Sequence, residues 1–371
     1  MSGSTFQRIW LPGFVLQSVI IGGGYATGRE LVEFFLSSGP VGGFLGMLAA
    51  TIMFSVVCAL CFELARLTHS YNYRSFFQQL LGRGWFLFEI AYFVLGLLVL
   101  AVVGAAAGEL TGTHLGIPPT VVTVIFMALV GLLVFWGTAL IEKALASWAF
   151  LLYVTYVTLV VCYLWQHGGD LMSNLSAGVV DSEWLLKGVR YVGYNVAVIP
   201  VILFCVSHMT SRKDAFTAGV LAGPLVMAPA ILFYLAMAAA YPAILDSAVP
   251  ADFLMRGLNM PWLMVIFYIV VFGTLVATGT AFIHAVNERI DEAYREKNRE
   301  MAHWQRLTVA FVALLIAVVL AGKIGLIDLI AKGYGTLTWV FIAVFLVPLC
   351  TVGVWKIRRG KESAAPDGSP S

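Results

Sequence analysis

Apolar runs long enough to cross a membrane recur along this 371-residue chain and constrain its fold more than any other feature. An α-helix needs about 20 predominantly apolar residues to span the hydrocarbon core of a bilayer. Ten segments meet or approach this length: Trp10–Leu36, Gly42–Leu67, Trp85–Ala107, Thr120–Phe135, Ala144–Trp165, Leu185–Val206, Ala215–Ala240, Pro261–Ala285, Trp304–Ala321 and Gly335–Val354. Only 11% of the residues are charged, whereas a soluble domain has about 25%. The sequence therefore predicts an all-α polytopic membrane protein with ten transmembrane helices.

The basic residues are distributed unevenly between the connections, and this predicts an orientation. Cytoplasmic loops of membrane proteins carry an excess of Lys and Arg. With the N-terminus inside, most of the 22 basic residues fall on the cytoplasmic side, including those in Arg289–Arg306 and Lys356–Lys361. Because ten is an even number of spans, the C-terminus is then expected to be cytoplasmic as well.

Three consecutive glycines, Gly22-Gly23-Gly24, occur near the middle of the first segment. The stretch IIGGGYATGRE has glycine spacing close to that of a dinucleotide-binding loop, but such a loop follows a soluble β-strand, and here both flanks are membrane spans. Close helix packing through Gly24 and Gly28 is a second alternative. Three adjacent glycines exceed what one helix contact requires, so we favour a break in the first helix.

The sixth segment carries a corresponding group of helix-breaking residues at Gly193-Tyr194-Asn195, followed by Pro200. Five spans separate the starts of the two segments, so the two halves of the chain have opposite orientations. Paired interruptions in inverted halves are typical of transporters, in which they surround a site near the bilayer midplane. The pattern predicts a 5+5 inverted repeat with broken helices 1 and 6. Its regions are residues 1–166 as the first repeat, 167–356 as the second repeat and 357–371 as a disordered cytoplasmic tail.

Three short motifs give the chain a family resemblance: GGGYATGRE in the first segment, SSGPVGG after it and CFELARL in the second segment. Together with the two interruptions, they resemble the LeuT-type fold of the amino acid–polyamine–organocation superfamily. Across its length the chain looks most like the uncharacterised bacterial YkvI-like membrane proteins. The resemblance implies a secondary active transporter in the bacterial cytoplasmic membrane that moves a small polar solute, such as an amino acid or related zwitterion, by alternating access. Transport would be coupled to Na⁺ or H⁺, with the substrate between helices 1, 3, 6 and 8.

The same resemblance implies roles for individual residues. The substrate site would contain Gly22, Gly23, Gly24, Tyr25, Gly193, Tyr194 and Asn195. Glu63 falls where a carboxylate of helix 2 braces the unwound parts of helices 1 and 6, although it could simply pair with Arg66 three residues later.

The resemblance places Arg29 at the position of the extracellular gate arginine of LeuT-type transporters. It could pair with Glu33 four residues along the helix, and Asp328 is an alternative gate partner. The chain also departs from the family pattern here. The first helix has no Asn or Asp to ligate a sodium ion beside the substrate, and Arg29 is followed by Glu30-Leu31 rather than Phe-Pro.

Two kinds of residue are candidates for ion coupling. Thr278 and Thr280, with Thr274, lie in the eighth segment, which pairs with helix 1 to hold Na⁺ in the resembling transporters. Hydroxyl oxygens suit a hard cation, although Thr in a membrane helix also bonds to its own backbone. Lys143 is the rival, because proton-coupled relatives can place an ammonium group where Na⁺ would sit; its alternative is a Lys that extends to the membrane interface.

The remaining motifs favour structural roles. Cys58 and Cys61 form a CxxC, but no second pair or nearby His completes a metal set, so both are interpreted as small buried residues. The charged stretch Asn287–Arg306 indicates a solvated extension of the eighth helix, with a regulatory or partner-binding helix as the alternative.

The sequence does not favour an enzyme, because it contains neither an HExxH nor a GxSxG motif. We expect a small-molecule substrate and the lipid bilayer as partners, no nucleic acid, and no cofactor or metal beyond Na⁺ as a coupling ion. A channel or a non-transporting membrane sensor is the alternative function.

Overall fold

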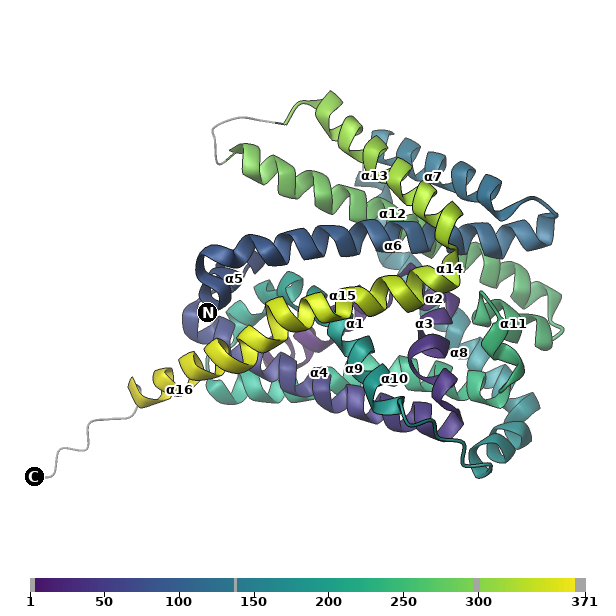
Figure 1. Ribbon diagram of the computed structural model, residues 1–371, viewed down its shortest axis with the longest axis horizontal. Coiled ribbons are helices and arrows are strands. Elements are labelled where there is room, and N and C mark those ends of the chain that lie inside the picture. Colours follow the sequence, from purple (N-terminus) through teal and green to yellow (C-terminus); the bar gives the residue numbers. More distant parts are fainter. Residues whose placement is uncertain (1–3, 137–138, 296–300, 364–371) are drawn as a thin grey trace, which may run out of the picture.

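The computed structural model of the protein describes residues 4–136, 139–295 and 301–363 and consists of packed helices (Figure 1). These residues contain no β-strand, so the predicted all-α class is confirmed. Segments of π- or 3₁₀-helix, labelled η, occur beside the α-helices. In chain order the elements are η1 (Phe6–Trp10), α1 (Leu11–Ile20), α2 (Gly23–Thr27), α3 (Arg29–Phe34), η2 (Leu36–Ser38), α4 (Pro40–Thr68), α5 (Tyr73–Leu81), η3 (Gly82–Trp85), α6 (Phe86–Leu115), α7 (Pro119–Trp136), α8 (Ala139–Ser176), α9 (Trp184–Asn195), η4 (Val196–His208), α10 (Arg212–Ala239), η5 (Ala243–Asp246), α11 (Pro250–Gly257), α12 (Pro261–Arg295), α13 (His303–Ile324), α14 (Leu326–Asp328), η6 (Leu329–Tyr334), α15 (Gly335–Phe341), η7 (Ile342–Leu346), η8 (Leu349–Gly353) and α16 (Val354–Ser363).

Eight helical stretches of the described chain are long and apolar enough to cross a membrane. They are Pro40–Thr68, Tyr73–Gly112, Phe150–Ser176, Trp184–His208, Arg212–Ala239, Pro261–Asp291, Trp304–Ile324 and Leu326–Gly360. The apolar helix α7 is shorter, and the first predicted span is divided among η1, α1, α2 and α3. The protein is therefore a multi-pass membrane protein, as the sequence predicted.

The helices pack as two groups, and each group draws its members from both halves of the chain. In one group α4 packs along α10 and α9, while α1 lies against α10 and η4. In the other group α6 contacts α7, α12 and α13. Figure 1 shows α7, α12 and α13 on one side of α6, with α4, α9 and α10 on the other. The long helix α8 touches both groups, through α10 and α12.

The first span is interrupted twice. Helix α1 ends at Ile20, and Gly22 takes an extended backbone conformation (φ −105°, ψ −166°) before α2 begins. Gly28 then adopts the left-handed conformation (φ +78°, ψ −7°) between α2 and α3. Gly reaches this region without the steric penalty that a Cβ imposes. The break predicted at the glycines of helix 1 is confirmed, and Gly28 adds a second interruption.

The sixth span differs from the prediction. Helix α9 ends at Asn195 and continues directly as the 3₁₀-helix η4, and both Asn195 and Val196 keep right-handed helical backbone angles. Pro200 lies inside η4, where it lacks the N–H of an α-helical hydrogen bond and crowds the preceding turn. Helix 6 is thus not broken by a non-helical gap but changes helix type. Runs of 3₁₀-helix longer than 3–4 residues are uncommon, and within a helix they often mark a hinge.

The segment predicted to be a disordered tail is partly helical. Helix α16 continues to Ser363, which includes the first residues of the predicted tail. Residues 364–371 lie outside the described part of the chain. The N-terminal end and α16 lie at the same end of the bundle, on the left of Figure 1.

The charged segment after the eighth span extends helix α12 to Arg295, as predicted. Beyond residues 296–300, which the structure does not describe, Arg306 donates to Glu288 at 3.2 Å and contacts Asp291 at 2.9 Å. Arg295 also pairs with Asp291 at 2.7 Å. The two contacts of Arg306 join the start of α13 to the end of α12.

Candidate functional site

Side chains from three other helices enclose the interruption of the first span. Tyr156 on α8 donates a hydrogen bond from its hydroxyl to the carbonyl oxygen of Ala26 in α2. A Cβ placed on Gly22 would lie 3.8 Å from Oγ1 of Thr278 on α12. A Cβ on Gly28 would lie 3.0 Å from the ring of Phe233 on α10. Non-helical backbone at membrane depth is tolerated only where protein or a water-filled cavity surrounds it, and this enclosure meets that condition.

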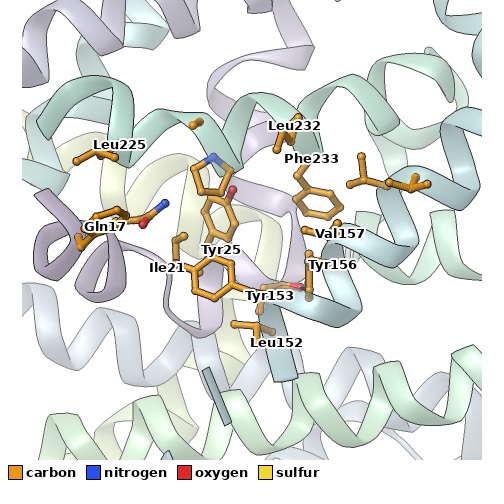
Figure 2. A pocket seen from close by; sticks show the side chains of 16 residues that line it. Gln17, Ile21, Tyr25, Leu152, Tyr153, Tyr156, Val157, Leu225, Leu232 and Phe233 are labelled. Carbon is orange, nitrogen blue, oxygen red and sulfur yellow. Dashed lines mark hydrogen bonds between the residues drawn. The ribbon is translucent and has the colours of Figure 1, made fainter. Parts of the chain in front are cut away.

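A cavity of about 370 Å³ lies beside the interruption, between α1 and α2 on one side and α8 and α10 on the other (Figure 2). Its walls are mostly apolar, and the lining residues with polar side-chain groups are Gln17, Tyr25, Tyr153 and Tyr156. Small-molecule sites typically occupy about 300–1,000 Å³ and combine apolar walls with a few polar groups. The resemblance implied a site between helices 1, 3, 6 and 8, whereas this cavity lies between the first, fifth and seventh spans.

Tyr25 is the predicted site residue that the structure places in this cavity. Figure 2 shows it between Gln17 and Ile21 on one side and Tyr156 and Phe233 on the other. Only 5% of Tyr25 is exposed, and among the described residues its buried hydroxyl has no hydrogen-bond partner. An unsatisfied buried hydroxyl costs about 1–3 kcal/mol. A ligand that supplies a hydrogen-bonding group would remove that cost.

The predicted residues of helix 6 do not line the cavity. A Cβ on Gly193 would meet the side chain of Thr338 on α15 at 2.6 Å, so this glycine allows close packing against the last span. The side-chain amide of Asn195 donates to the carbonyl oxygen of Tyr191 in its own helix at 2.9 Å. Tyr194 contacts the first span at Glu30, outside the predicted helix 1 half of the site.

Tyr194 on α9 donates a hydrogen bond to Glu30 on α3, with 2.5 Å between the phenol oxygen and Oε2. Glu30 is 6% exposed, and Tyr194 is 4% exposed. The ring of Tyr194 stacks on that of Tyr334 in η6, with centroids 4.6 Å apart. Glu30 was not among the predicted site residues and was noted only as a departure from the family pattern. An acidic residue inside a membrane span is the signal that could have identified it.

Arg29 is 6% exposed and connects α3 to the segment before α11. Its guanidinium donates to the carbonyl oxygens of Leu245 at 2.6 Å and Ser247 at 3.1 Å, and to Glu33 at 3.0 Å. The predicted i,i+4 pair is therefore present. Asp328 pairs with Lys332 at 2.9 Å instead, so it is not the partner of Arg29 in this structure.

Glu63 is almost fully buried near the end of α4 and forms a two-point ion pair with Arg66, at 2.8 and 2.9 Å. Arg212, at the start of α10, lies 4.0 Å from the same carboxylate. The contact with Arg212 joins α4 to α10. Among the described residues, no hydrogen bond or ion pair connects Glu63 to the interrupted backbone of helix 1.

The candidate ion-coupling residues differ in where they lie. Thr274, Thr278 and Thr280 each donate a hydrogen bond to a carbonyl of their own helix. Of these, Thr278 has its hydroxyl near Gly22. Thr280 is two residues further along the helix, about 200° around its axis. Lys143 belongs to α8, but its side chain lies outside the part that the structure describes.

The cysteines are unpaired, and Cys58 and Cys61 are both buried in α4. The described residues contain no group of His, Cys, Asp and Glu side chains that could hold a metal ion. The CxxC therefore has the buried, apolar setting that the sequence indicated.

Comparison with known proteins supports the resemblance read from the motifs. The chain is 23% identical over 351 residues to "Uncharacterized membrane protein YkvI" of Bacillus subtilis (strain 168), covering 91% of this chain and 94% of that protein. No protein-family model matches the chain.

Two solved structures share the fold. MhsT in complex with L-phenylalanine superposes with a TM-score of 0.53 at 13% identity, over 92% of this chain and 98% of that chain. The substrate-bound, outward-open state of a Na⁺-coupled sialic acid symporter superposes with a TM-score of 0.51 at 14% identity, over 97% and 95%. The overall fold is therefore LeuT-like, as the sequence resemblance predicted.

Proposed function

We propose that this protein is a secondary active transporter that moves a small polar solute, such as an amino acid or related zwitterion, across the cytoplasmic membrane. The observation that carries the proposal is the twice-interrupted first span beside a cavity of about 370 Å³ lined by Tyr25, whose buried hydroxyl has no hydrogen-bond partner among the described residues. An interrupted membrane helix exposes backbone polar groups that can bind a solute or an ion. The proposed substrate site combines Gly22, Gly23, Gly24 and Tyr25 at the interruption, whereas Tyr194 of helix 6 does not line the cavity and contacts Glu30.

The arrangement of helices supports alternating access. The first two spans of each half form one group, and the third and fourth spans of each half form the other. This pairing is what a 5+5 inverted repeat of ten spans would produce. Rocking of one group against the other would expose the site to each side of the membrane in turn. The long 3₁₀ segment η4 directly follows α9, and it could act as a hinge for this movement.

The orientation of the proposed transporter follows from its charges. The basic residues favour a cytoplasmic N-terminus, and the N-terminal end and α16 lie at one end of the bundle. Both termini are then cytoplasmic. Helix α3, beyond the interruption, lies on the outer half of the first span.

Transport is proposed to be coupled to Na⁺ or H⁺. The closeness of the Thr278 hydroxyl to Gly22 supports a Na⁺ site at the interruption, since hard cations take oxygen ligands. One structure of similar fold belongs to a Na⁺-coupled symporter. The buried Glu30 supports H⁺ and is considered below.

Reconstitution into liposomes tests the proposal. Purified protein is inserted into vesicles, and uptake of a mixture of radiolabelled amino acids is measured with an imposed Na⁺ gradient, a pH gradient or neither. We expect accumulation that needs one of the gradients and that disappears when an ionophore collapses it. Folded protein that accumulates no amino acid under any gradient would overturn the proposal. Currents in planar bilayers far above the turnover of a carrier would indicate a channel instead.

A further inference from the structure

Glu30 is an acidic side chain enclosed within the helix bundle. Helix α3, which carries it, packs against α9 and η6, and the residue is 6% exposed. Its Oε2 accepts the hydrogen bond of Tyr194, which lies 164 residues later in the chain. This one contact therefore connects the first span of one half of the protein to the first span of the other half.

Four phenols interact with the Glu30 carboxyl group. Tyr25 lies on α2, Tyr191 and Tyr194 on α9, and Tyr334 on η6. Each of the four is at most 5% exposed. A phenol can donate a hydrogen bond to the carboxyl group, but it brings no positive charge.

Other titratable groups on α3 and on the elements packed against it have different partners. Arg29, the neighbour of Glu30 in sequence, donates to another carboxylate and to two backbone carbonyls. On α10, the hydroxyl of Tyr234 donates to the carbonyl oxygen of Pro40 at 2.7 Å. On α11, Asp252 pairs with Arg256 at 2.7 Å.

Two basic residues of α9 and η6 have other neighbours in the described structure. The guanidinium of Arg190 on α9 lies 3.6 Å from the Cβ position of Gly335 on α15. Lys332 on η6 pairs with Asp328. In the part of the chain that the structure describes, no Lys, Arg or His forms an ion pair with Glu30.

A carboxylate buried in apolar surroundings without a cation is strongly destabilised, and binding of a proton removes the charge. We propose that Glu30 is the proton-binding group of this protein and that H⁺ is a coupling ion. The proposal rests on the transport function proposed above. Glu30 holds a proton while α3 and α9 are packed together, as they are here.

Separation of α3 from α9 during transport would admit water to the carboxyl group. In that open state the O–H bond of the acid breaks, the proton passes to water and the carboxylate remains. When the site is open to the opposite side of the membrane, the carboxylate takes one proton from water and forms the O–H bond again before α3 and α9 pack together. No other bond is made or broken, and one proton crosses the membrane per cycle.

Infrared spectroscopy tests the proton site without requiring any substrate. The C=O stretch of a carboxylic acid is measured in the purified wild-type protein as the pH is raised, and the experiment is repeated with Glu30→Gln. We expect an acid band at neutral pH that Glu30→Gln lacks. Glu183→Gln, which removes an exposed carboxyl group at the start of α9, should retain the band. An identical set of acid bands in the wild type and Glu30→Gln would overturn the proposal.

Tyr194→Phe provides a second variant in case Glu30→Gln fails to fold. It keeps the ring that stacks on Tyr334 and keeps the carboxyl group, but it removes the hydrogen bond. The acid band should then move in frequency rather than vanish. A band that is unchanged in Tyr194→Phe would contradict its assignment to Glu30.

Transport measurements separate failure of this inference from failure of the proposed function. Vesicles loaded with a pH-sensitive dye receive the amino-acid mixture, and proton entry is followed together with amino-acid exchange. The pH-driven accumulation by Glu30→Gln should be at least about tenfold lower than that by the wild type. Exchange should continue, because the neutral amide of glutamine resembles the protonated acid. Accumulation that stays pH-driven in Glu30→Gln would overturn the proton role. Wild-type protein that neither accumulates nor exchanges would overturn the transport proposal, and the infrared result would still decide whether Glu30 binds a proton.

Discussion

The hydroxyl of Tyr156 on α8 donates its hydrogen bond to the carbonyl oxygen of Ala26, within the short helix between the two interruptions of the first span. We expect Tyr156→Phe to destabilise the protein by about 1 kcal/mol, because a typical hydrogen bond contributes about 0.5–1.5 kcal/mol. Denaturation in detergent measures the change. Tyr153→Phe is the matched control, since the Tyr153 hydroxyl lines the same cavity and has no hydrogen-bond partner among the described residues. Equal effects of the two substitutions would contradict the assigned role of Tyr156.

Tyr25→Phe should separate binding from stability. The Tyr25 hydroxyl is buried and has no partner within the described chain, so its removal breaks no hydrogen bond inside the protein. We expect a melting temperature equal to or slightly above that of the wild type. The thermal shift caused by the amino-acid mixture should become smaller, because a ligand would lose a hydrogen-bonding group. A marked loss of stability without ligand, with the thermal shift unchanged, would argue against a site at Tyr25.

The two glycines that flank α2 should differ in their tolerance of a side chain. Gly28 has φ +78°, and a Cβ there would contact the ring of Phe233 at 3.0 Å. Gly28→Ala is expected to cost about 1–2 kcal/mol from the left-handed backbone alone. Gly22→Ala should be nearly neutral for stability, because Gly22 has φ −105° and its nearest side-chain atom is at 3.8 Å. Thermal denaturation of both variants measures the difference in stability. A larger loss of stability for Gly22→Ala than for Gly28→Ala would contradict the backbone conformations described at these two glycines.

The ion pair between Asp181, in the loop before α9, and Lys187, at the start of α9, predicts a pH-dependent contribution to stability. The hydrogen bond from the Lys187 ammonium, at 3.2 Å, holds the pKa of the Asp181 carboxyl below its usual value. A carboxyl whose pKa is lowered by folding stabilises the folded state above its unfolded pKa of about 3.9. That contribution is lost as the pH falls through the folded pKa. The wild type should therefore be more stable than Asp181→Asn at neutral pH, and the difference should shrink in acid.

Salt provides a second check of the Asp181 prediction. An exposed ion pair is screened by salt, so high ionic strength should also reduce the difference between the wild type and Asp181→Asn. A difference that grows on acidification would contradict the prediction, because it would require the pKa of Asp181 to be raised in the folded protein.

Features that depend on a short stretch of sequence could be predicted. The length and apolar character of the spans are local properties, and the helices occur where the apolar runs indicated. The interruption at Gly22 follows from the backbone freedom of adjacent glycines. The pairs of Arg29 with Glu33 and of Arg66 with Glu63 follow from spacings of three or four residues on one helix.

Contacts between distant segments were decided by the tertiary structure. The sequence did not show that Tyr194 would reach Glu30, that Tyr156 would hold Ala26 or that the cavity would form against α8 and α10. The sequence also did not show whether helix 6 would break at Gly193-Tyr194-Asn195 or change to 3₁₀ geometry after it. A single sequence records which residues can break a helix or carry a charge. Which of them meet depends on how the helices are rotated and packed against one another, and that is fixed by the summed contacts of the whole bundle.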